Sequence, residues 1–438
     1  MTFQEKPKIP VFVLTILNRL KKSGHEAFIV GGAVRDMIMS RPVMDWDITT
    51  SAAPEKIMTI FQDTRHFALK HDTVTLVADG KLYEVTPFKT ASEYGTSLEE
   101  DLGHRDFTVN AMAYEPEKAV TIDPYGGRKD IERKLVRAVD NPRERFLEDP
   151  LRLLRAVRVA VDLRFKIEDE TQAVVTEMAD QIAGVAKERV RDELMKILMC
   201  PRPSMGFNLM KRMALLDFFL PELLEGYGRK QNPQYHRYTI FKHVMETVDR
   251  VEADPVMRLT ALLHDIAKPR VREKIAGRFR FYGHEEASAD LAAEMMGRLK
   301  FSNDMVGQVS HLIRHHMIGY DSKWGDSAVR RLIRRVGPEN MDRFLAFRRA
   351  DLLAHGIEDV QMPLLTELEG RVQKMIDKPL AVTPGDLAVN GSTVMEALNL
   401  SPGPRIGKIL EQLMEKVIDH PSWNTREKLL ALLAEMKT

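Results

Sequence analysis

Cysteine is almost absent from this chain of 438 residues, and it has neither long apolar runs nor an excess of charge of one sign. The lone Cys200 excludes a disulfide framework and a cysteine-rich zinc site, and it favours a reducing, cytoplasmic location. No apolar run approaches the ~18 residues of a membrane span, and no signal-peptide cleavage pattern follows the first helix, so we expect no membrane partner. Because 65 Lys and Arg balance 64 Asp and Glu, any nucleic-acid-binding surface must be local.

Two kinds of pattern follow one another along the chain. In residues 1–140 short strands alternate with short helices; AFIV (27–30) is a predicted strand, and Asp79-Gly80 is a turn signal inside a predicted hairpin over 74–88. From Pro142 onward the apolar residues recur almost purely at helical spacing. The length suggests about three domains, and the patterns predict an α/β head followed by a long helical remainder.

Two aspartates in the head suggest a metal site. Asp45 and Asp47 lie two apart on a predicted strand over 45–50, so their side chains should share a face and would repel each other without a divalent cation. Alone, this pattern is more often a solvated strand edge. Gly31-Gly32 and Arg35, placed between a strand and a helix where backbone amides and a cation can approach phosphates, favour a nucleotidyl transfer site instead.

Further motifs occur in a fixed order after GGAVRD and DWDITT. They are RDFTVNAMAY (105–114), IDPYGGRKDI (122–131), LEDPLRLLRAVRVA (147–160) and ERVRDELMKIL (188–198). This set resembles the class II tRNA nucleotidyltransferase and bacterial poly(A) polymerase family, whose head has the DNA polymerase beta fold. The resemblance implies that Asp45 and Asp47 bind catalytic Mg²⁺; Glu84 is a candidate third carboxylate or an ordinary polar strand residue. It also implies a nucleotide site, whose candidate residues are Gly31, Gly32, Arg35, Arg105, Asp106, Asn110, Glu148, Asp149, Arg152, Arg155 and Arg158.

One helix is expected to select the base. Asp149 and Arg152 are three residues apart on a predicted helix, so we expect their tips to converge. An aspartate that accepts and an arginine that donates can together complement the edge of cytosine. Arg155 and Arg158 continue this spacing among apolar residues, which favours a partly buried polar site over surface salt bridges.

A second metal site is predicted in the helical region, at His243, His264-Asp265 and Asp351. An isolated His-Asp pair is usually structural. The surrounding segments HRYTIFKHVMETV, LTALLHDIAK, RFYGHEEAS and RRADLLAHG resemble the HD phosphohydrolase superfamily, as it occurs appended to tRNA nucleotidyltransferases. The resemblance implies a divalent metal of unknown identity and phosphoester hydrolysis. Other histidines are additional ligand candidates, with packing or RNA contact the more ordinary role for the last three: His284, His311, His315 and His316.

The motifs divide the chain into four predicted parts. These are a DNA polymerase beta-like α/β nucleotidyltransferase head (1–140), an elongated all-α neck with the base-selecting helix (141–228), an HD-type helical body (229–360) and a helical tRNA-binding tail (361–438). The tail resembles the C-terminal segment of bacterial members of the family. Four arginines on one predicted helix form either a phosphate-binding patch or a solvated basic face: Arg330, Arg331, Arg334 and Arg335.

The function predicted from these features is template-independent addition of C residues to the 3′ end of tRNA, from CTP. Between TPFK (86–89) and RDFTVN (105–110) lies only TASEYGTSLEEDLGH, where full CCA-adding relatives carry a longer segment; His104 and Asp72 also depart from the family pattern. A short loop resembles CC-adding enzymes, whose product a separate A-adding enzyme completes. We therefore predict CC addition alone, with full CCA addition from CTP and ATP as the alternative. Less favoured are a poly(A) polymerase, an HD phosphohydrolase with a relic head, and a pure RNA-binding module.

Overall fold

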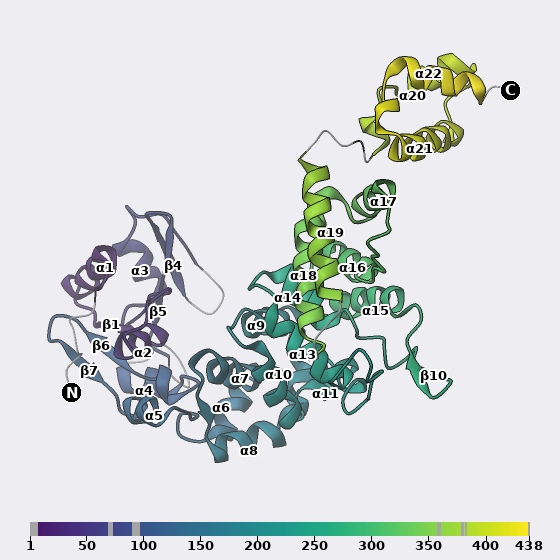
Figure 1. The fold of residues 1–438 in the computed structure, drawn as a ribbon. Coiled ribbons are helices and arrows are strands. Elements are labelled where there is room, and N and C mark those ends of the chain that lie inside the picture. The colour runs from purple at the N-terminus through teal and green to yellow at the C-terminus, as the bar shows by residue number, and fades with distance from the viewer. Residues whose placement is uncertain are drawn as a thin grey trace. The chain divides into compact units, whose positions relative to one another are not determined.

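The computed structural model describes residues 8–68, 73–89, 97–356, 361–377, 381 and 383–436. Asp72 and the first seven residues of the short segment 90–104 lie outside these ranges. The chain divides into two compact units, residues 1–219 and 220–438 (Figure 1). The finer division into four parts stays a prediction. No helix in the described ranges is long and apolar enough to cross a membrane.

The head is built on a seven-stranded sheet with the order β3-β4-β5-β2-β1-β6-β7. All neighbouring strands are antiparallel except β2 and β5, which run parallel and place Asp47 opposite Glu84. The strands are β1 (Ala27–Val30), β2 (Asp47–Thr50), β3 (His66–Ala68), β4 (Val74–Ala78), β5 (Lys81–Pro87), β6 (Ala113–Glu115) and β7 (Val120–Ile122).

The first unit also contains helices and one small additional sheet. The sheet pairs β8 (Leu135–Val136) with β9 (Lys166–Ile167). The helices are α1 (Val11–Lys22), α2 (Gly32–Ile38), α3 (Pro54–Ile60), α4 (Leu98–Gly103), α5 (Gly127–Arg133), α6 (Pro142–Glu148), α7 (Arg152–Leu163), α8 (Asp169–Glu177), α9 (Lys187–Leu198), α10 (Pro203–Arg212) and α11 (Leu216–Phe219), with 3-10 turns at Thr108–Asn110 and Ala179–Gly184.

Both faces of the sheet are covered, because successive side chains of a strand point to opposite sides. On β1, Ala27 and Ile29 join the core formed with α1, α2 and α3, whereas Phe28 and Val30 face the opposite side, where Leu102 of α4 packs. The predicted strand AFIV and the hairpin over 74–88 are confirmed. Asp79 and Gly80 both have positive φ, 51° and 71°, as a tight hairpin turn requires.

The second unit is almost entirely helical, as predicted, but it includes a β-hairpin that the sequence pattern did not predict. The hairpin consists of β10 (Glu273–Ile275) and β11 (Arg278–Arg280). The helices are α12 (Glu222–Glu225), α13 (Ile240–Arg250), α14 (Pro255–Leu263), α15 (His284–Arg298), α16 (Asn303–His315), α17 (Asp326–Val336), α18 (Met341–Leu353), α19 (Gln361–Ile376), α20 (Gly391–Leu398), α21 (Pro404–Asp419) and α22 (Arg426–Glu435), with 3-10 turns at Pro338–Asn340, Pro384–Asp386 and Pro421–Trp423.

The last three helices have a hydrophobic core of their own. Val394 of α20, Leu413 of α21 and Leu429 of α22 are fully buried in one cluster. Burying such side chains stabilises a fold by about 1.5–3 kcal/mol each. Ion pairs, described below, join α21 to α17.

Candidate active site and a second metal-ligand cluster

A pocket of about 330 Å³ opens in the first unit beside the end of β1. It is lined by side chains from the central strands and from the segments around α4 and α7. Most of the residues predicted for the nucleotide site line it, namely Gly31, Gly32, Asp47, Glu84, Arg105, Asp106, Asn110, Asp149, Arg152 and Arg155. The sequence therefore identified most of the polar residues that line this pocket.

Asp47 and Glu84 form the carboxylate side of this pocket. Burial raises the pKa of Asp47, although Arg105 opposes the shift, and Asp45 raises it further. Burial likewise raises the pKa of Glu84, with Asp47 and Asp45 adding to the effect. The charges of Asp47 and Glu84 are thus destabilised by burial and by nearby carboxylates, which a divalent cation bound by oxygen ligands would relieve.

The predicted strand over 45–50 begins two residues late, at Asp47. Asp45 lies before β2, is exposed, and does not line the pocket. The expectation that Asp45 and Asp47 share one strand face is therefore wrong. Asp45 acts on Asp47 from the adjoining segment, where its charge raises the pKa of the Asp47 carboxyl.

Gly31 allows two charged groups to approach the backbone. Its φ is 71°, and a Cβ at this position would lie 3.0 Å from Nη1 of Arg105 and 3.2 Å from Oδ2 of Asp47. A side chain would thus be both strained and crowded. The glycine leaves room for the guanidinium and the carboxylate beside the backbone in the lining of the pocket.

Arg35 is placed differently from the expectation that it reaches a triphosphate. It is buried, donates to Oδ1 of Asn110 at 2.7 Å, and pairs with Asp36 at 3.0 Å. It does not line the pocket. Its role in the structure is to hold Asn110, which lines the pocket.

Asn110 continues this polar chain into the pocket wall. Its Nδ2 donates to Oδ1 of Asp106 at 3.1 Å, and Nε of Arg155 donates to Oδ2 of Asp106 at 2.8 Å. Burial alone would raise the pKa of Asp106, but Arg155 and Asn110 outweigh it and hold that pKa well below its usual value. Asp106 in turn raises the pKa of Arg155. Arg155 is therefore a fixed cation at the pocket.

The two base-selecting candidates do not share a helix. Asp149 follows α6 with extended backbone, φ −151° and ψ 98°, and Arg152 is the first residue of α7. Arg189 of α9 holds the Asp149 carboxylate through two hydrogen bonds, of 3.1 and 2.8 Å. The expected convergence of Asp149 and Arg152 on one helix face is therefore wrong, although both line the pocket.

Arg152 is held by different groups. It donates to a carboxylate oxygen of Glu148 at 2.7 Å, and to the backbone oxygens of Arg145 at 3.0 Å and His104 at 2.6 Å. Glu148 also pairs with Arg145 at 2.8 Å. Glu148 thus supports Arg152 and does not itself line the pocket.

Arg158 lies outside the pocket lining and forms an ion pair with the buried Glu193 of α9. Sequence reasoning missed Lys89, Asp101 and Arg189. Burial and Arg105 lower the pKa of Lys89, which lines the pocket. Of these three, only Arg189 carried a signal, because it lies within the motif ERVRDELMKIL.

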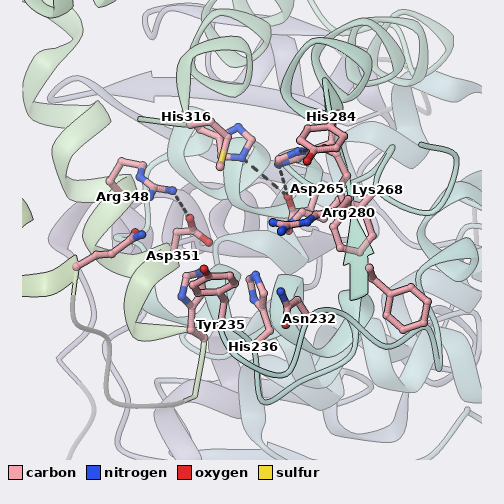
Figure 2. Close-up of a pocket in the computed structure, with 16 residues that line it drawn as sticks. Asn232, Tyr235, His236, Asp265, Lys268, Arg280, His284, His316, Arg348 and Asp351 are labelled. Carbon is pink, nitrogen blue, oxygen red and sulfur yellow. Dashed lines mark hydrogen bonds and ion pairs between the residues drawn. The ribbon is translucent and has the colours of Figure 1, made fainter. Parts of the chain in front are cut away.

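In the second unit, a pocket of about 290 Å³ lies against a buried cluster of histidines and aspartates (Figure 2). The four residues predicted for the HD site meet in this cluster, and two of them, Asp265 and Asp351, line the pocket. Nε2 of His243 lies 3.0 Å from Asp351 and 3.4 Å from Asp265, and Nε2 of His264 lies 3.2 Å from Asp265. α13, the end of α14, and α18 each supply part of the set.

This cluster is charged and almost inaccessible to water. Burial lowers the pKa of His264, but Asp265 outweighs burial and raises it to about 9. His264 and Lys268 hold the pKa of Asp265 well below its usual value, against burial. His243, His264 and Arg348 do the same for the pKa of Asp351. Lys268 lies 2.7 Å from Asp265, and Arg348 lies 2.5 Å from Asp351.

The donor set fits a metal ion. Both carboxylate oxygens of Asp265 are buried and make no hydrogen bond, although Lys268 lies at ion-pair distance from Oδ2. Imidazole and carboxylate ligands that converge within 4.8 Å, as His243, His264 and Asp265 do, suit a transition metal. His284 and His316 join this pocket, whereas His311 and His315 pair with each other on α16, and His311 contacts the backbone oxygen of Val336.

The predicted arginine patch on α17 is engaged within the protein. Arg331 contacts Glu415 at 3.1 Å and Asp419 at 2.8 Å, and Arg334 contacts Glu415 at 2.6 Å, all across to α21. Arg330 donates to the backbone oxygen of Ile418 at 2.6 Å. Arg335 is exposed. RNA binding by this patch stays a prediction, and it would have to compete with these ion pairs.

The fold and the head pocket define a nucleotidyltransferase with a helical body. Three family profiles match the chain: the "Poly A polymerase head domain" over residues 27–137, the "Probable RNA and SrmB- binding site of polymerase A" over 164–226, and "tRNA nucleotidyltransferase domain 2" over 284–433. The A-adding tRNA nucleotidyltransferase of Deinococcus radiodurans is 32% identical over 409 residues, 89% of this chain and 91% of that protein.

This chain is also similar to two CCA-adding enzymes. That of Lactobacillus gasseri is 29% identical over 438 residues, 96% of each chain. The crystal structure of the Bacillus stearothermophilus CCA-adding enzyme in complex with CTP superposes with a TM-score of 0.75 at 29% identity, covering 98% of each chain. This chain belongs to the class II tRNA nucleotidyltransferases of the poly(A) polymerase superfamily. The HD assignment stays a prediction.

Proposed function

We propose that this protein adds nucleotides to the 3′ end of tRNA without a template, with CTP as its first substrate. The observation that carries the proposal is a single pocket whose lining includes the Asp47 and Glu84 carboxylates together with Arg152, Arg155 and Asp149. Carboxylates for metal ions and fixed cations for a triphosphate are the groups that nucleotidyl transfer requires. We infer tRNA as the acceptor from the names of the relatives.

Each side of the pocket has a distinct task. Asp45, Asp47 and Glu84 would hold Mg²⁺, which when bound supplies charge neutralisation at the transferring phosphate and lowers the pKa of the attacking hydroxyl. Arg105, Arg155 and Lys89 bind and orient the triphosphate. Arg152 and Asp149 face the base, as donor and acceptor respectively.

Two functions differ in the number of bases added, namely full CCA addition and CC addition. The names of the relatives, CCA-adding and A-adding enzymes, favour full CCA addition from CTP and ATP over the CC-only addition predicted from the sequence. We therefore take full CCA addition as the function. CC addition completed by a separate A-adding enzyme is the second candidate, and the short segment 90–104 favours it; residues 90–96 lie outside the described ranges.

The deciding experiment extends a tRNA that lacks its 3′ CCA, with CTP and ATP supplied separately and together. Products are resolved at single-nucleotide length. A terminal A at ordinary ATP concentration supports full CCA addition, and a product that stops at CC establishes the second candidate. Absence of any CTP incorporation would contradict the proposed function itself.

Replacing Asp149 with Ala should relax the choice of nucleotide more than it slows the reaction. Loss of a base-reading contact reduces discrimination by roughly tenfold to 100-fold. Competition between CTP and UTP measures the ratio of kcat/KM values. Asp192→Ala, at an exposed ion pair on α9, is the control. Unchanged CTP preference in Asp149→Ala would show that the base is read elsewhere.

We further propose that the buried cluster of the second unit binds a divalent metal and hydrolyses phosphoesters. The cluster lies against a pocket whose lining includes the cations Lys268, Arg280 and Arg348 (Figure 2). Cations around a metal site favour an anionic, phosphate-bearing substrate. This activity would be separate from nucleotide addition.

The double variant His264→Ala/Asp265→Ala should lose its bound metal and phosphodiesterase activity while retaining nucleotide addition. Metal is measured by mass spectrometry of the desalted protein, and hydrolysis with bis-p-nitrophenyl phosphate. His311→Ala/His315→Ala is the matched control, since these histidines lie outside the pocket. Full metal content in the first variant would contradict this ligand set.

A further inference from the structure

We propose that the β10–β11 hairpin and the aromatic segment after it bind single-stranded RNA. The binding surface consists of Lys274, Arg278, Arg280 and Tyr282, and we call it the hairpin surface. The hairpin extends away from the helices of the second unit (Figure 1). This surface is separate from the head pocket, and binding to it needs no metal ion.

The hairpin concentrates positive charge in a chain that has almost none overall. Residues 270–280 contain five cations and one carboxylate, whereas the formal net charge of the whole chain is +1. Arg270 is engaged by Glu225 at 2.7 Å. Lys274 and Arg278 are exposed and form no ion pair with any residue in the described part of the chain. A local excess of unpaired positive charge attracts a polyanion.

The strand register places both arginines of β11 on one face of the hairpin. Successive side chains of a strand alternate between faces, so Arg278 and Arg280 share a face. Their cross-strand partners are Ile275 and Glu273. Two residues along a strand span about 6.6 Å, which is comparable to the spacing of successive phosphates in an extended nucleic-acid strand. The two guanidinium groups can therefore bind neighbouring phosphates.

The opposite face of the hairpin is packed within the protein. Phe279 pairs with Lys274 across the strands, and the Arg272 guanidinium lies 3.6 Å from the centroid of the Phe279 ring. An isolated two-stranded hairpin is only marginally stable in water, and this cation–π contact adds to its stability. The contact therefore helps to keep Arg278 and Arg280 in place on the other face.

Cations alternate with aromatic rings along the segment RFRFY, from Arg278 to Tyr282. Phe279, Phe281 and Tyr282 line the pocket of the second unit, and Tyr282 is 69% exposed. Cations that follow the backbone and exposed rings that stack on bases are the combination that binds single-stranded nucleic acid. An acidic peptide would leave the rings unused, and a duplex keeps its bases stacked inside. The choice of RNA over DNA alone rests on the proposed function.

The test measures binding of a labelled oligouridylate of about twelve nucleotides to the full-length protein, by fluorescence anisotropy at several salt concentrations. Arg278→Ala/Arg280→Ala should weaken binding by roughly tenfold. It should also flatten the slope of log Kd against log salt by about 1.4, because each phosphate contact to a single strand contributes about 0.7. Arg278→Lys/Arg280→Lys keeps both charges and should keep the slope. Lys323→Ala/Lys374→Ala, at exposed positions of the same unit, is the control.

Tyr282→Ala tests the stacking contact. It should weaken binding by roughly tenfold without changing the salt slope, and Tyr282→Phe should restore binding because a phenyl ring also stacks on a base. In the unmodified protein, 4-thiouridine placed in the oligonucleotide should crosslink to the peptide that contains residues 278–282, which mass spectrometry identifies.

Three results overturn the inference. Unchanged affinity in either Arg278→Ala/Arg280→Ala or Tyr282→Ala would refute the hairpin surface. Crosslinks confined to residues 1–219 would place the bound strand in the head. Binding of oligothymidylate or polyglutamate as tight as that of oligouridylate would show that the surface does not select RNA. The circular dichroism spectrum and thermal unfolding of each variant show that it is folded.

In the head, we infer that Asp101 is a positioning residue for Lys89 and Arg105, two of the cations proposed to bind the triphosphate. Asp101 is 2% exposed and lines the pocket. Its Oδ1 accepts from the backbone N–H of Lys89 at 3.1 Å, and its Oδ2 accepts from Nη2 of Arg105 at 3.2 Å. Within the described ranges, no other side chain accepts a hydrogen bond from the Arg105 guanidinium.

One carboxylate thus connects two cations that come from different elements. Lys89 lies just beyond β5, and Arg105 lies just beyond α4. Burial and Arg105 lower the pKa of Lys89, and Asp101 opposes that shift, so Asp101 favours the charged form that binds phosphate. This inference rests on the proposed triphosphate site.

Asp101→Asn keeps the shape of the side chain and one acceptor for the Lys89 N–H, but it removes the negative charge beside Arg105. It should raise the Kd for pyrophosphate and that for CTP by roughly tenfold, while the Kd for cytidine, which has no phosphate, stays unchanged. Calorimetry measures all three values. Glu100→Gln, at an exposed position of the same helix, is the control.

Unchanged pyrophosphate binding in Asp101→Asn would refute the positioning role, and so would an equal loss for pyrophosphate and cytidine, which indicates general damage to the pocket. If the unmodified protein binds neither CTP nor pyrophosphate, the proposed triphosphate site itself is wrong.

Discussion

Asp47→Asn should lower nucleotide addition by about 10³-fold or more, because the carboxylate that would hold Mg²⁺ loses its charge while its shape is kept. The binding of tRNA should change little. Single-turnover extension of tRNA with CTP measures the loss, and filter binding measures the affinity. Asp63→Asn, at an exposed ion pair with Arg19, is the matched control. Extension at near-normal rate by Asp47→Asn would refute the assignment of this pocket.

The same variant should unfold at a higher temperature than the unmodified protein in metal-free buffer at pH 7. Burial raises the pKa of Asp47 in the folded state above its pKa in the unfolded chain. As the pH rises above the unfolded-state pKa, ionisation of Asp47 therefore destabilises the folded state. Asparagine removes that charge. Calorimetry at pH 7 with and without Mg²⁺ tests this, and Mg²⁺ should stabilise the unmodified protein but not the variant.

Asp106→Ala should destabilise the head by about 2–4 kcal/mol and also impair nucleotide addition, because it leaves Arg155 and Asn110 without their shared acceptor. The pKa of Asp106 is lower in the folded state than its ordinary value of 3.8 in the unfolded chain. The stabilisation by ionised Asp106 is therefore fully present above pH 3.8 and is lost as the pH falls through the folded-state pKa. Urea unfolding at pH 7 and pH 3 measures both effects. Equal loss at the two pH values would show that the ion pair contributes nothing.

Asp106→Asn separates the two roles of this residue. The amide keeps the shape and one acceptor, so the fold should lose less stability than with alanine. Arg155 would still lose its charged partner. Activity that falls in Asp106→Asn with little loss of stability would assign the effect to Arg155.

Local sequence patterns predicted the parts of the fold that local chemistry determines. The strand AFIV and the Asp79-Gly80 hairpin follow from β-rich runs and a turn that needs positive φ, and both are confirmed. The β10–β11 hairpin was missed because its strands are three residues each and mostly charged, and the alternation in Arg278-Phe279-Arg280 is shorter than the four to eight residues that indicate a strand.

The site was predicted less completely, because partners come from distant segments. Asp149 takes its orientation from Arg189, forty residues away, and Arg35 is diverted to Asn110, seventy-five residues away. Both contacts join residues too far apart in the sequence for a pattern within one helical turn to predict them. The HD candidates were found through motif resemblance, and of the additional histidine candidates His284 and His316 line the pocket of the second unit, whereas His311 and His315 do not.

Ion pairs between α17 and α21 have a consequence for binding measurements. Arg331 and Arg334 are partly exposed, so dissolved salt screens their attraction to Glu411, Glu415 and Asp419. If tRNA contacts this end of the molecule, raising the ionic strength would loosen the helices at the same time as it weakens contacts to phosphates. The slope of affinity against salt would then overstate the number of phosphates bound, and Arg334→Ala should flatten it.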